Sequence, residues 1–155
     1  MRRFNVFAPA FEYDDGRPAG YRAGTARIGP SIGSRRMSST VYELPEGEST
    51  WPYHYEYGAE EWLIVLDGRP TLRHPGGEDE LEPGDVVCFP EGPEGAHKLT
   101  NRGSRTARLM IVSTYDRPAV AVFPDSDKLG VWPDGEDDIL IVRRESAVDY
   151  WDRER

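Results

Sequence analysis

The sequence predicts an all-β domain, either an antiparallel sandwich or a barrel. Short apolar or alternating runs recur at a spacing of roughly ten residues, which is typical of small β folds. The 155 residues include 16 glycines and 13 prolines, which favour frequent turns. No heptad pattern or tandem repeat competes with this interpretation. The length favours one domain, residues 1–155.

Each expected strand is a short run that ends at a turn signal. Gly29-Pro30 ends the first run, and Pro45-Glu46-Gly47 ends the second. Asp67-Gly68 follows the most apolar run and joins it directly to the next, so we expect a hairpin there. The expected strands are residues 23–28, 37–44, 62–66, 69–73, 78–81, 86–89, 96–101, 108–114, 120–123 and 139–142.

The flanks of the chain are less regular than its centre. We expect an N-terminal arm over residues 1–35, a strand-rich core over 36–123 and a C-terminal extension over 124–155. Within the arm, residues 31–36 are small and polar, which predicts a loop.

The C-terminal extension carries two further signals. Residues 125–138 are polar and irregular, and the acidic run Glu136-Asp137-Asp138 within them is expected to be a solvated loop. Ser146 with Asp149 three positions later is a weak capping box, which predicts a short C-terminal helix over residues 147–153.

The composition narrows the class of partner. A net charge of −9 argues against nucleic acid and against anionic membrane surfaces, which leaves a small-molecule ligand as the expected partner. Cys88 is the single cysteine, so no intramolecular disulfide is possible, and we expect it to be buried as a small apolar side chain. With no apolar leader after Arg2-Arg3, a cytoplasmic location is expected.

Residues 53–68, Y-H-Y-E-Y-G-A-E-E-W-L-I-V-L-D-G, carry the most chemistry. Strand side chains alternate between faces, so His54 and Glu56 point the same way. Glu61 then shares a face with apolar residues of the next run. Buried charge is costly unless it is paired or ligates a metal, so this polar group on an apolar face indicates a metal site. His97, after the loop P-E-G-P-E-G, is the second imidazole that could reach it.

Two segments resemble the paired motifs of the cupin superfamily. Residues 47–68 match the first motif through His54, Glu61 and Gly68, with six residues between that glutamate and the glycine. Residues 84–101, G-D-V-V-C-F-P-E-G-P-E-G-A-H-K-L-T-N, match the second motif through His97 and its preceding Gly and Pro residues. The chain is most similar to small single-domain bacterial cupins of uncharacterised function. The resemblance implies a double-stranded β-helix, which is a jelly-roll barrel.

The resemblance also implies one divalent metal ion held by His54, Glu61 and His97. Glu56 stands where the motif has a second histidine, and a carboxylate there can still ligate. Two imidazoles and two carboxylates would favour Fe, Mn or Zn. If Glu56 turns away, a triad of two histidines and one carboxylate remains. Glu60 is the alternative to Glu61, because the register past Gly58 is open.

The sequence indicates weaker roles for several other polar and aromatic residues. Tyr55 and Trp62 are candidate substrate-binding residues, although aromatic side chains on a sheet more often pack in a core. His74 is expected at an exposed turn, and Asn101 is expected to satisfy backbone groups at a turn.

The resemblance implies a metal-dependent enzyme of the oxygenase, isomerase or epimerase, or decarboxylase type acting on a small polar metabolite. The alternative is a cupin that binds a sugar-like molecule without catalysis. A structural cupin whose polar cluster has no ligand is a third interpretation, since fold alone does not determine function. Because an open sandwich must protect its strand edges, we also expect a homodimer.

Overall fold

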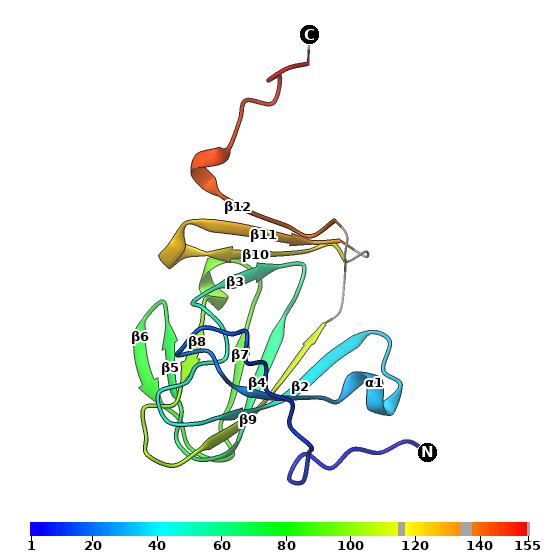
Figure 1. Ribbon diagram of the computed structural model, residues 1–155, viewed down its shortest axis with the longest axis vertical. Helices are drawn as coiled ribbons and strands as arrows, with labels where there is room; N and C mark the ends of the chain where they lie inside the picture. Colours follow the sequence, from blue (N-terminus) through cyan, green and yellow to red (C-terminus); the bar gives the residue numbers. More distant parts are fainter. Residues whose placement is uncertain (115–116, 134–137, 155) are drawn as a thin grey trace.

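Twelve strands build three antiparallel sheets in the computed structural model, which describes residues 1–114, 117–133 and 138–154 (Figure 1). Their bounds are β1 Gly24–Arg27, β2 Met37–Leu44, β3 Tyr55–Tyr57, β4 Glu61–Asp67, β5 Thr71–His74, β6 Gly77–Glu80, β7 Val86–Phe89, β8 Lys98–Thr100, β9 Ala107–Thr114, β10 Ala119–Phe123, β11 Lys128–Trp132 and β12 Leu140–Arg143. The one α-helix in this part of the chain is the single turn α1, Gly29–Ile32. No helix among the described residues is long and apolar enough to cross a membrane.

The sheets form the body of a jelly roll. The five-stranded sheet has the order β1-β2-β9-β4-β7, and the three-stranded sheet has the order β6-β5-β8. The four-stranded sheet, β12-β11-β10-β3, lies across the end of the body that is farther from the N-terminus (Figure 1). The all-β prediction is therefore confirmed, and the strands at 37–44 and 86–89 have the predicted bounds.

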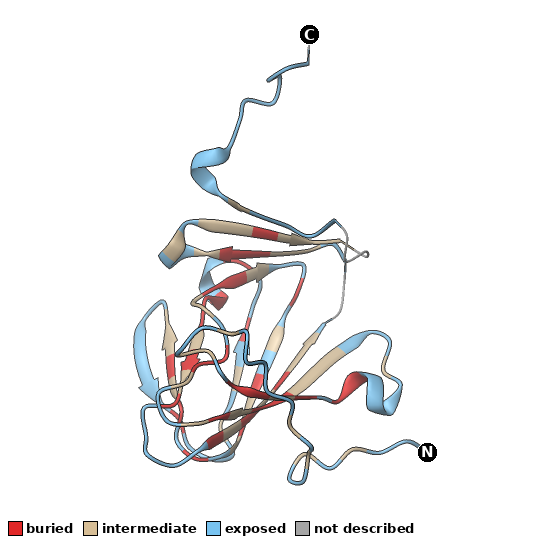
Figure 2. Cartoon of the chain, in the orientation of Figure 1, coloured by how far each residue is buried: buried red, intermediate tan, exposed pale blue. Residues whose placement is uncertain are grey.

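The main core lies between the five-stranded and three-stranded sheets. Alternation sends Leu63 and Val65 of β4 inward, next to Leu109 of β9, and all three are at most 2% exposed. Leu99 of β8 closes the same cluster from the other sheet. The buried segments run along the middle of the barrel in Figure 2. This core holds β4 and the loop before β8, which carry two of the candidate ligands, in fixed positions.

The turn at Asp67-Gly68 does not form the expected hairpin. β4 pairs with β7 and β9, whereas β5 pairs with β6 and β8, so the turn moves the chain from one sheet to another. Gly68 has a φ of +78°, and a Cβ there would lie 2.7 Å from the Cα of Ala107. The close approach of β9 therefore requires glycine and directs the chain away from β4.

Two further local expectations are wrong in part. We expect a loop over residues 31–36, but Ser31 and Ile32 belong to α1, which has proline in its first turn, and only residues 33–36 lie outside helix and strand. Residues 128–132, within the segment expected to be irregular, form β11 because they pair along their length with β10. Of the acidic run in that segment, Glu136 and Asp137 lie outside the described residues, and Asp138 is exposed.

The expected C-terminal helix is also absent from residues 147–153, which form turns after a 3₁₀ turn at Arg144–Ser146. The carboxylate of Asp149 accepts a hydrogen bond from the backbone N–H of Trp151, two residues ahead, which favours a turn over a helix. Val148 and Trp151 are at least 70% exposed, so no buried apolar face stabilises a helix here.

Cys88 is exposed, although we expect it to be buried. The side chain is exposed on the outer face of β7, while the neighbouring Phe89 points inward and is buried.

Candidate metal centre

His54 and His97 lie opposite each other on paired backbone segments. The N–H of His54 donates to the carbonyl of His97 at 3.1 Å, and the N–H of His97 donates back at 2.8 Å. This two-bond bridge brings the imidazole rings to 4.7 Å between centroids. The two histidines predicted from distant parts of the sequence therefore share one site.

Backbone carbonyls orient both imidazoles in the same way. Nδ1 of His54 is 2.8 Å from the carbonyl oxygen of Pro52, and Nδ1 of His97 is 2.9 Å from that of Gly95. Because a carbonyl oxygen only accepts, each Nδ1 carries the proton and each Nε2 keeps its lone pair. A metal-binding histidine commonly has this second hydrogen bond, which sets its tautomer.

Glu61 completes the group from the start of β4. Its Oε2 lies 3.5 Å from Nε2 of His97. One donor atom from each of His54, Glu61 and His97 lies within 4.8 Å of the others. The histidines are 7% and 2% exposed, so water has little access to either ring.

The loop before His97 is shaped by close packing. A Cβ on Gly95 would overlap the backbone carbonyl of Pro90, so this position accepts only glycine without movement. The ring of Phe89 stacks on His97 with centroids 3.7 Å apart and an angle of 8° between the planes. Together with the carbonyl of Gly95, this stacking holds His97 in one orientation.

Burial shifts the pKa of each group toward the neutral form. It lowers the pKa of His97 to about 3, with a further contribution from His54, and it lowers the pKa of His54. Burial, with the charge of Glu56, raises the pKa of Glu61 to about 8. Both shifts disfavour an ion pair at the 3.5 Å contact of Glu61 with His97. A divalent cation would favour ionised Glu61, and two neutral imidazoles beside a carboxylate are a suitable donor set for one.

Glu56 lines the same cavity but is not one of the three converging groups. Burial raises its pKa, and the positive charge of Arg117 opposes that shift. Glu60 lies at the surface, where its Oε1 accepts a hydrogen bond from Nε1 of Trp62 at 3.1 Å. The structure thus brings Glu61, and not Glu60, to the histidines.

The two aromatic residues predicted to bind substrate lie outside this cavity. Tyr55 points to the opposite side of β3 from Glu56 and packs with Ala96 and Val122 in a separate core cluster. Trp62 is 52% exposed on the outer face of β4. Alternation along each strand explains both positions, because their neighbours Glu56 and Glu61 occupy the inward face.

The cavity has a volume of about 470 Å³ and a mixed polar and aromatic lining. Tyr42, Trp51, Phe123 and Trp132 supply its aromatic surface, and Nε1 of Trp51 donates to the hydroxyl of Tyr42 at 3.1 Å. Sequence reasoning did not assign these four to the site. Trp51 lies close to His54 within the first motif, which is the one local signal that could have indicated it.

The two remaining polar candidates, Asn101 and His74, make hydrogen bonds outside the metal centre. The amide Nδ2 of Asn101 donates to the carbonyls of Leu44 and Arg105, each at 2.8 Å, so the expectation that it satisfies backbone groups is confirmed. His74 lies at the β5–β6 turn, where its Nε2 is 3.0 Å from a carboxylate oxygen of Asp79.

Comparison with known proteins supports a family assignment. The family model described as "Cupin domain" matches residues 40–113, which contain all the converging groups. A search of curated proteins found no match.

Solved structures share the fold over most of the chain. A candidate sugar phosphate isomerase from Acidithiobacillus ferrooxidans is 25% identical, with a TM-score of 0.77, over 84% of this chain and 81% of that one. A sugar phosphate isomerase of the cupin superfamily from Silicibacter pomeroyi is 20% identical, with a TM-score of 0.80, over 97% and 98%. The polyketide cyclase RemF from Streptomyces resistomycificus is 25% identical, with a TM-score of 0.63, over 76% and 82%. Residues 40–113 of this chain therefore form a cupin domain.

Proposed function

We propose that this protein is a metal-dependent cupin enzyme that isomerises or epimerises a small polar metabolite. One observation carries the proposal: His54, Glu61 and His97 converge in a cavity that also holds a second carboxylate, Glu56. The first three supply ligands, and Glu56 is available to move a proton. This division of roles is what proton transfer at a carbon beside a carbonyl requires.

Any divalent cation that this donor set binds would supply the same chemistry. A divalent Fe, Mn or Zn ion held by His54, Glu61 and His97 would act as a Lewis acid toward a carbonyl or hydroxyl oxygen of the substrate. The backbone carbonyls behind the two imidazoles keep each Nε2 directed at the shared site. Glu56 as a fourth ligand is the competing role for that residue.

Glu56 has the properties of a group that both takes and gives a proton. Its pKa is raised by burial, which brings it closer to the working pH of a general base. The nearby charge of Arg117 counteracts the shift and favours the ionised form before proton abstraction.

The isomerase type is favoured over the oxygenase and decarboxylase types by one comparison. The candidate sugar phosphate isomerase is 25% identical and covers most of the chain. Isomerisation also needs no oxidant, and its requirements are a Lewis acid and a proton carrier.

Solvent deuterium exchange tests the proposal directly. Protein stripped with a chelator and reloaded with Fe(II), Mn(II) or Zn(II) is incubated in D₂O with a panel of aldoses, ketoses and their phosphates, and exchange at carbon is followed by NMR. Glu56→Gln should reduce exchange by about 100-fold or more, the usual contribution of a general acid or base, while keeping its metal. Metal loss in this variant would instead identify Glu56 as a ligand.

Measurement of oxygen uptake tests the oxygenase alternative. Uptake with Fe(II) and small organic acids, in the absence of deuterium exchange, would replace the isomerase proposal with the oxygenase type. No turnover in either assay, together with a thermal shift caused by sugars, would favour the non-catalytic binding cupin. The Trp51 and Trp132 side chains suit that alternative, since aromatic surfaces pack well against sugar rings.

The proposal also covers the oligomeric state of the protein and its location in the cell. We propose a homodimer, because the edge strand β12 exposes apolar side chains that a second copy of the chain could cover. A cytoplasmic location suits a protein whose single cysteine is exposed, because thiols stay reduced there.

A further inference from the structure

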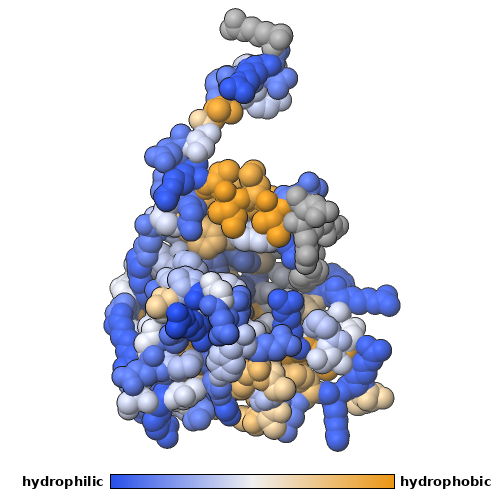
Figure 3. Space-filling model, viewed as in Figure 1, coloured by the Kyte–Doolittle hydropathy of each residue, from blue (hydrophilic) through white to orange (hydrophobic). Residues whose placement is uncertain are grey.

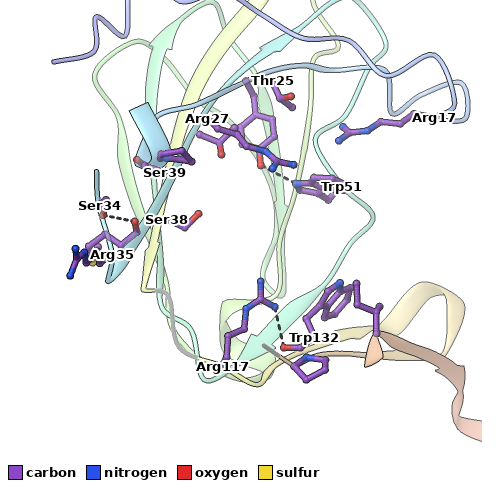
Figure 4. Close-up of a pocket in the computed structure, with 17 residues that line it drawn as sticks. Arg17, Thr25, Arg27, Ser34, Arg35, Ser38, Ser39, Trp51, Arg117 and Trp132 are labelled. Atoms are coloured by element: carbon purple, nitrogen blue, oxygen red, sulfur yellow. Dashed lines mark hydrogen bonds between the residues drawn. The ribbon is translucent and has the colours of Figure 1, made fainter. Parts of the chain in front are cut away.

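A second cavity adjoins the candidate metal centre. Its volume is about 800 Å³, and it shares Arg27, Tyr42, Trp51 and Arg117 with the inner cavity (Figure 4). The two cavities are thus parts of one continuous depression. Each cavity by itself falls within the volume of about 300–1,000 Å³ that is typical of small-molecule pockets.

The outer cavity is strongly basic. Arg17, Arg27, Arg35 and Arg117 line it, and no aspartate or glutamate is among the described residues that do so. The whole chain has 28 acidic and 19 basic side chains, so its average composition would place more carboxylates than guanidinium groups there. Four arginines that line one cavity raise the local positive potential on an acidic protein.

The arginines come from separate parts of the fold. Arg17 lies in the N-terminal arm, Arg27 ends β1, Arg35 lies between α1 and β2, and Arg117 precedes β10. In Figure 4, Arg17 and Arg27 lie at one end of the cavity, Arg117 extends toward it from the other end, and Arg35 lies at the rim. Side chains from four segments meet there only because the arm and the C-terminal sheet both pack on the barrel.

Arg17 provides a second, independent observation. Its guanidinium lies 4.4 Å from the ring centroid of Trp51, which restrains it, and its Nε is 3.8 Å from a carboxylate oxygen of Asp14. Its Nη1 is buried and has no hydrogen-bond partner. A buried donor without a partner is costly, and a ligand that accepts from it removes the cost.

We infer that this arginine-lined cavity binds the oxyanion end of the substrate, a phosphate or a carboxylate. Arginine forms paired, charge-assisted hydrogen bonds with both groups, and restrained guanidinium groups lose little entropy on binding. The identification of the bound anion as part of the substrate rests on the proposed function. On that basis the substrate is an anionic sugar or hydroxy acid whose other end reaches Glu56 in the inner cavity.

Binding of simple anions to metal-free protein tests this inference separately from catalysis. Inorganic phosphate and, in a parallel arm, malonate are titrated into chelator-treated protein at low ionic strength, and affinity is measured by calorimetry. Arg27→Gln and Arg17→Gln should each weaken binding by about tenfold, as expected for loss of one charged hydrogen bond. Arg105→Gln is the matched control, because it removes one positive charge from a side chain that is 82% exposed and does not line the cavity.

The two arms and the control give distinct outcomes. Phosphate binding weakened by either cavity substitution supports a phosphorylated substrate, and malonate binding weakened in the same way supports a carboxylate. No saturable binding of either anion, or equal weakening in all three variants, overturns the inference. Anion binding that occurs only in metal-loaded protein also overturns it and leaves the proposed function intact. Binding without any metal uptake supports the anion site while refuting the metal-dependent enzyme.

Discussion

The two histidines at the centre of this protein are held by backbone contacts on both sides. Reciprocal N–H to carbonyl bonds join His54 and His97, and further carbonyls accept from each Nδ1. The imidazoles therefore have little freedom to rotate, and their lone pairs already converge with Glu61. A site arranged before the ion arrives loses less entropy on binding it.

The first prediction concerns the proposed ligands. His97→Ala and Glu61→Gln should each weaken binding of Mn(II) or Zn(II) by more than about 100-fold, since altering only a ligand's supporting partner typically costs 10–100-fold. Metal content after reloading and desalting, measured by mass spectrometry, provides the test. Glu61→Gln has nearly the shape of the native side chain, so it separates ligand loss from misfolding.

His74→Ala is the matched control, since this histidine lies on the surface at the β5–β6 turn. It should leave metal content unchanged. If neither His54→Ala nor His97→Ala changes the bound metal, the site assignment is wrong.

The second prediction concerns Gly95. An added Cβ would overlap the backbone of Pro90, so Gly95→Ala should lower the free energy of unfolding by about 1–3 kcal/mol, as overpacking usually does. Because the carbonyl of Gly95 orients His97, metal affinity should fall as well. Urea denaturation and metal titration measure the two effects.

Gly29→Ala serves as the comparison, because a Cβ there would meet its nearest atom at an ordinary 3.5 Å. Equal stability of the two variants would show that the Pro90–Gly95 loop can relax, contrary to the packing argument.

At the scale of elements, a pair of charged side chains links the C-terminal sheet to the barrel. Both terminal nitrogens of Arg73, on β5, donate to the carboxylate of Asp125, in the 3₁₀ turn after β10, at 2.6 and 2.9 Å. The same guanidinium lies 4.0 Å from the ring centroid of Tyr53. This contact links the three-stranded sheet to the four-stranded sheet that covers the cavity.

The third prediction follows from this pair. Asp125→Asn should lower the free energy of unfolding at pH 7 by about 0.5 kcal/mol, a modest value because both side chains are exposed. The hydrogen bond from Arg73 holds the pKa of Asp125 below its ordinary value. The pair therefore stabilises the fold above the unfolded pKa of the carboxyl group, near 4, and this contribution is lost as pH falls through the folded pKa.

Denaturation of both proteins between pH 7 and pH 2.5 should show the difference shrinking below about pH 4. Asp152→Asn, in the C-terminal segment, is the comparison and should show a smaller difference throughout. A gap between wild type and Asp125→Asn that widens in acid would contradict the assignment.

At the scale of the whole molecule, the C-terminal segment leaves the body and exposes apolar side chains. β12 is an edge strand of its sheet, and its Leu140 and Ile141 are 53% and 54% exposed. In Figure 3, apolar surface gathers over this sheet, and the chain then continues away from the body. Val148, Tyr150 and Trp151 on that projecting segment are at least 70% exposed. An edge strand with an apolar surface and an unpacked tail is well suited to a second copy of the same chain.

The fourth prediction is that the protein sediments as a homodimer. Introducing Leu140→Asp and Ile141→Asp together should shift the mass to that of one chain, because buried unpaired charge opposes association. Val86→Asp, an equally exposed apolar position on the distant edge strand β7, is the control and should leave the dimer intact. A wild-type sedimentation mass of one chain would refute the prediction.

Local chain chemistry was sufficient for the fold class and for most strand positions. Glycine and proline turns divide the chain into short runs, and each run alternates or is apolar, so β2 and β7 could be predicted to the residue. Local chemistry failed where long-range pairing determines the structure. The residues of β11 lie within a mostly polar segment, and their pairing with β10 and β12 makes them a strand. The turn at Gly68 looked like a hairpin because the approach of Ala107 cannot be seen in the sequence.

The same division applies to the candidate site. Two motifs in the sequence were enough to nominate His54, Glu61 and His97, since their residue types and order are local information. Only the structure shows that Glu61, and not Glu60, faces the histidines. It also shows that Tyr55 and Trp62 face away from the cavity. A shift of one position along a strand reverses the face on which a side chain lies, so the sequence alone could not determine this. The arginine-lined cavity could be found only in the structure, since its four arginines have no common spacing and meet through the packing of separate segments.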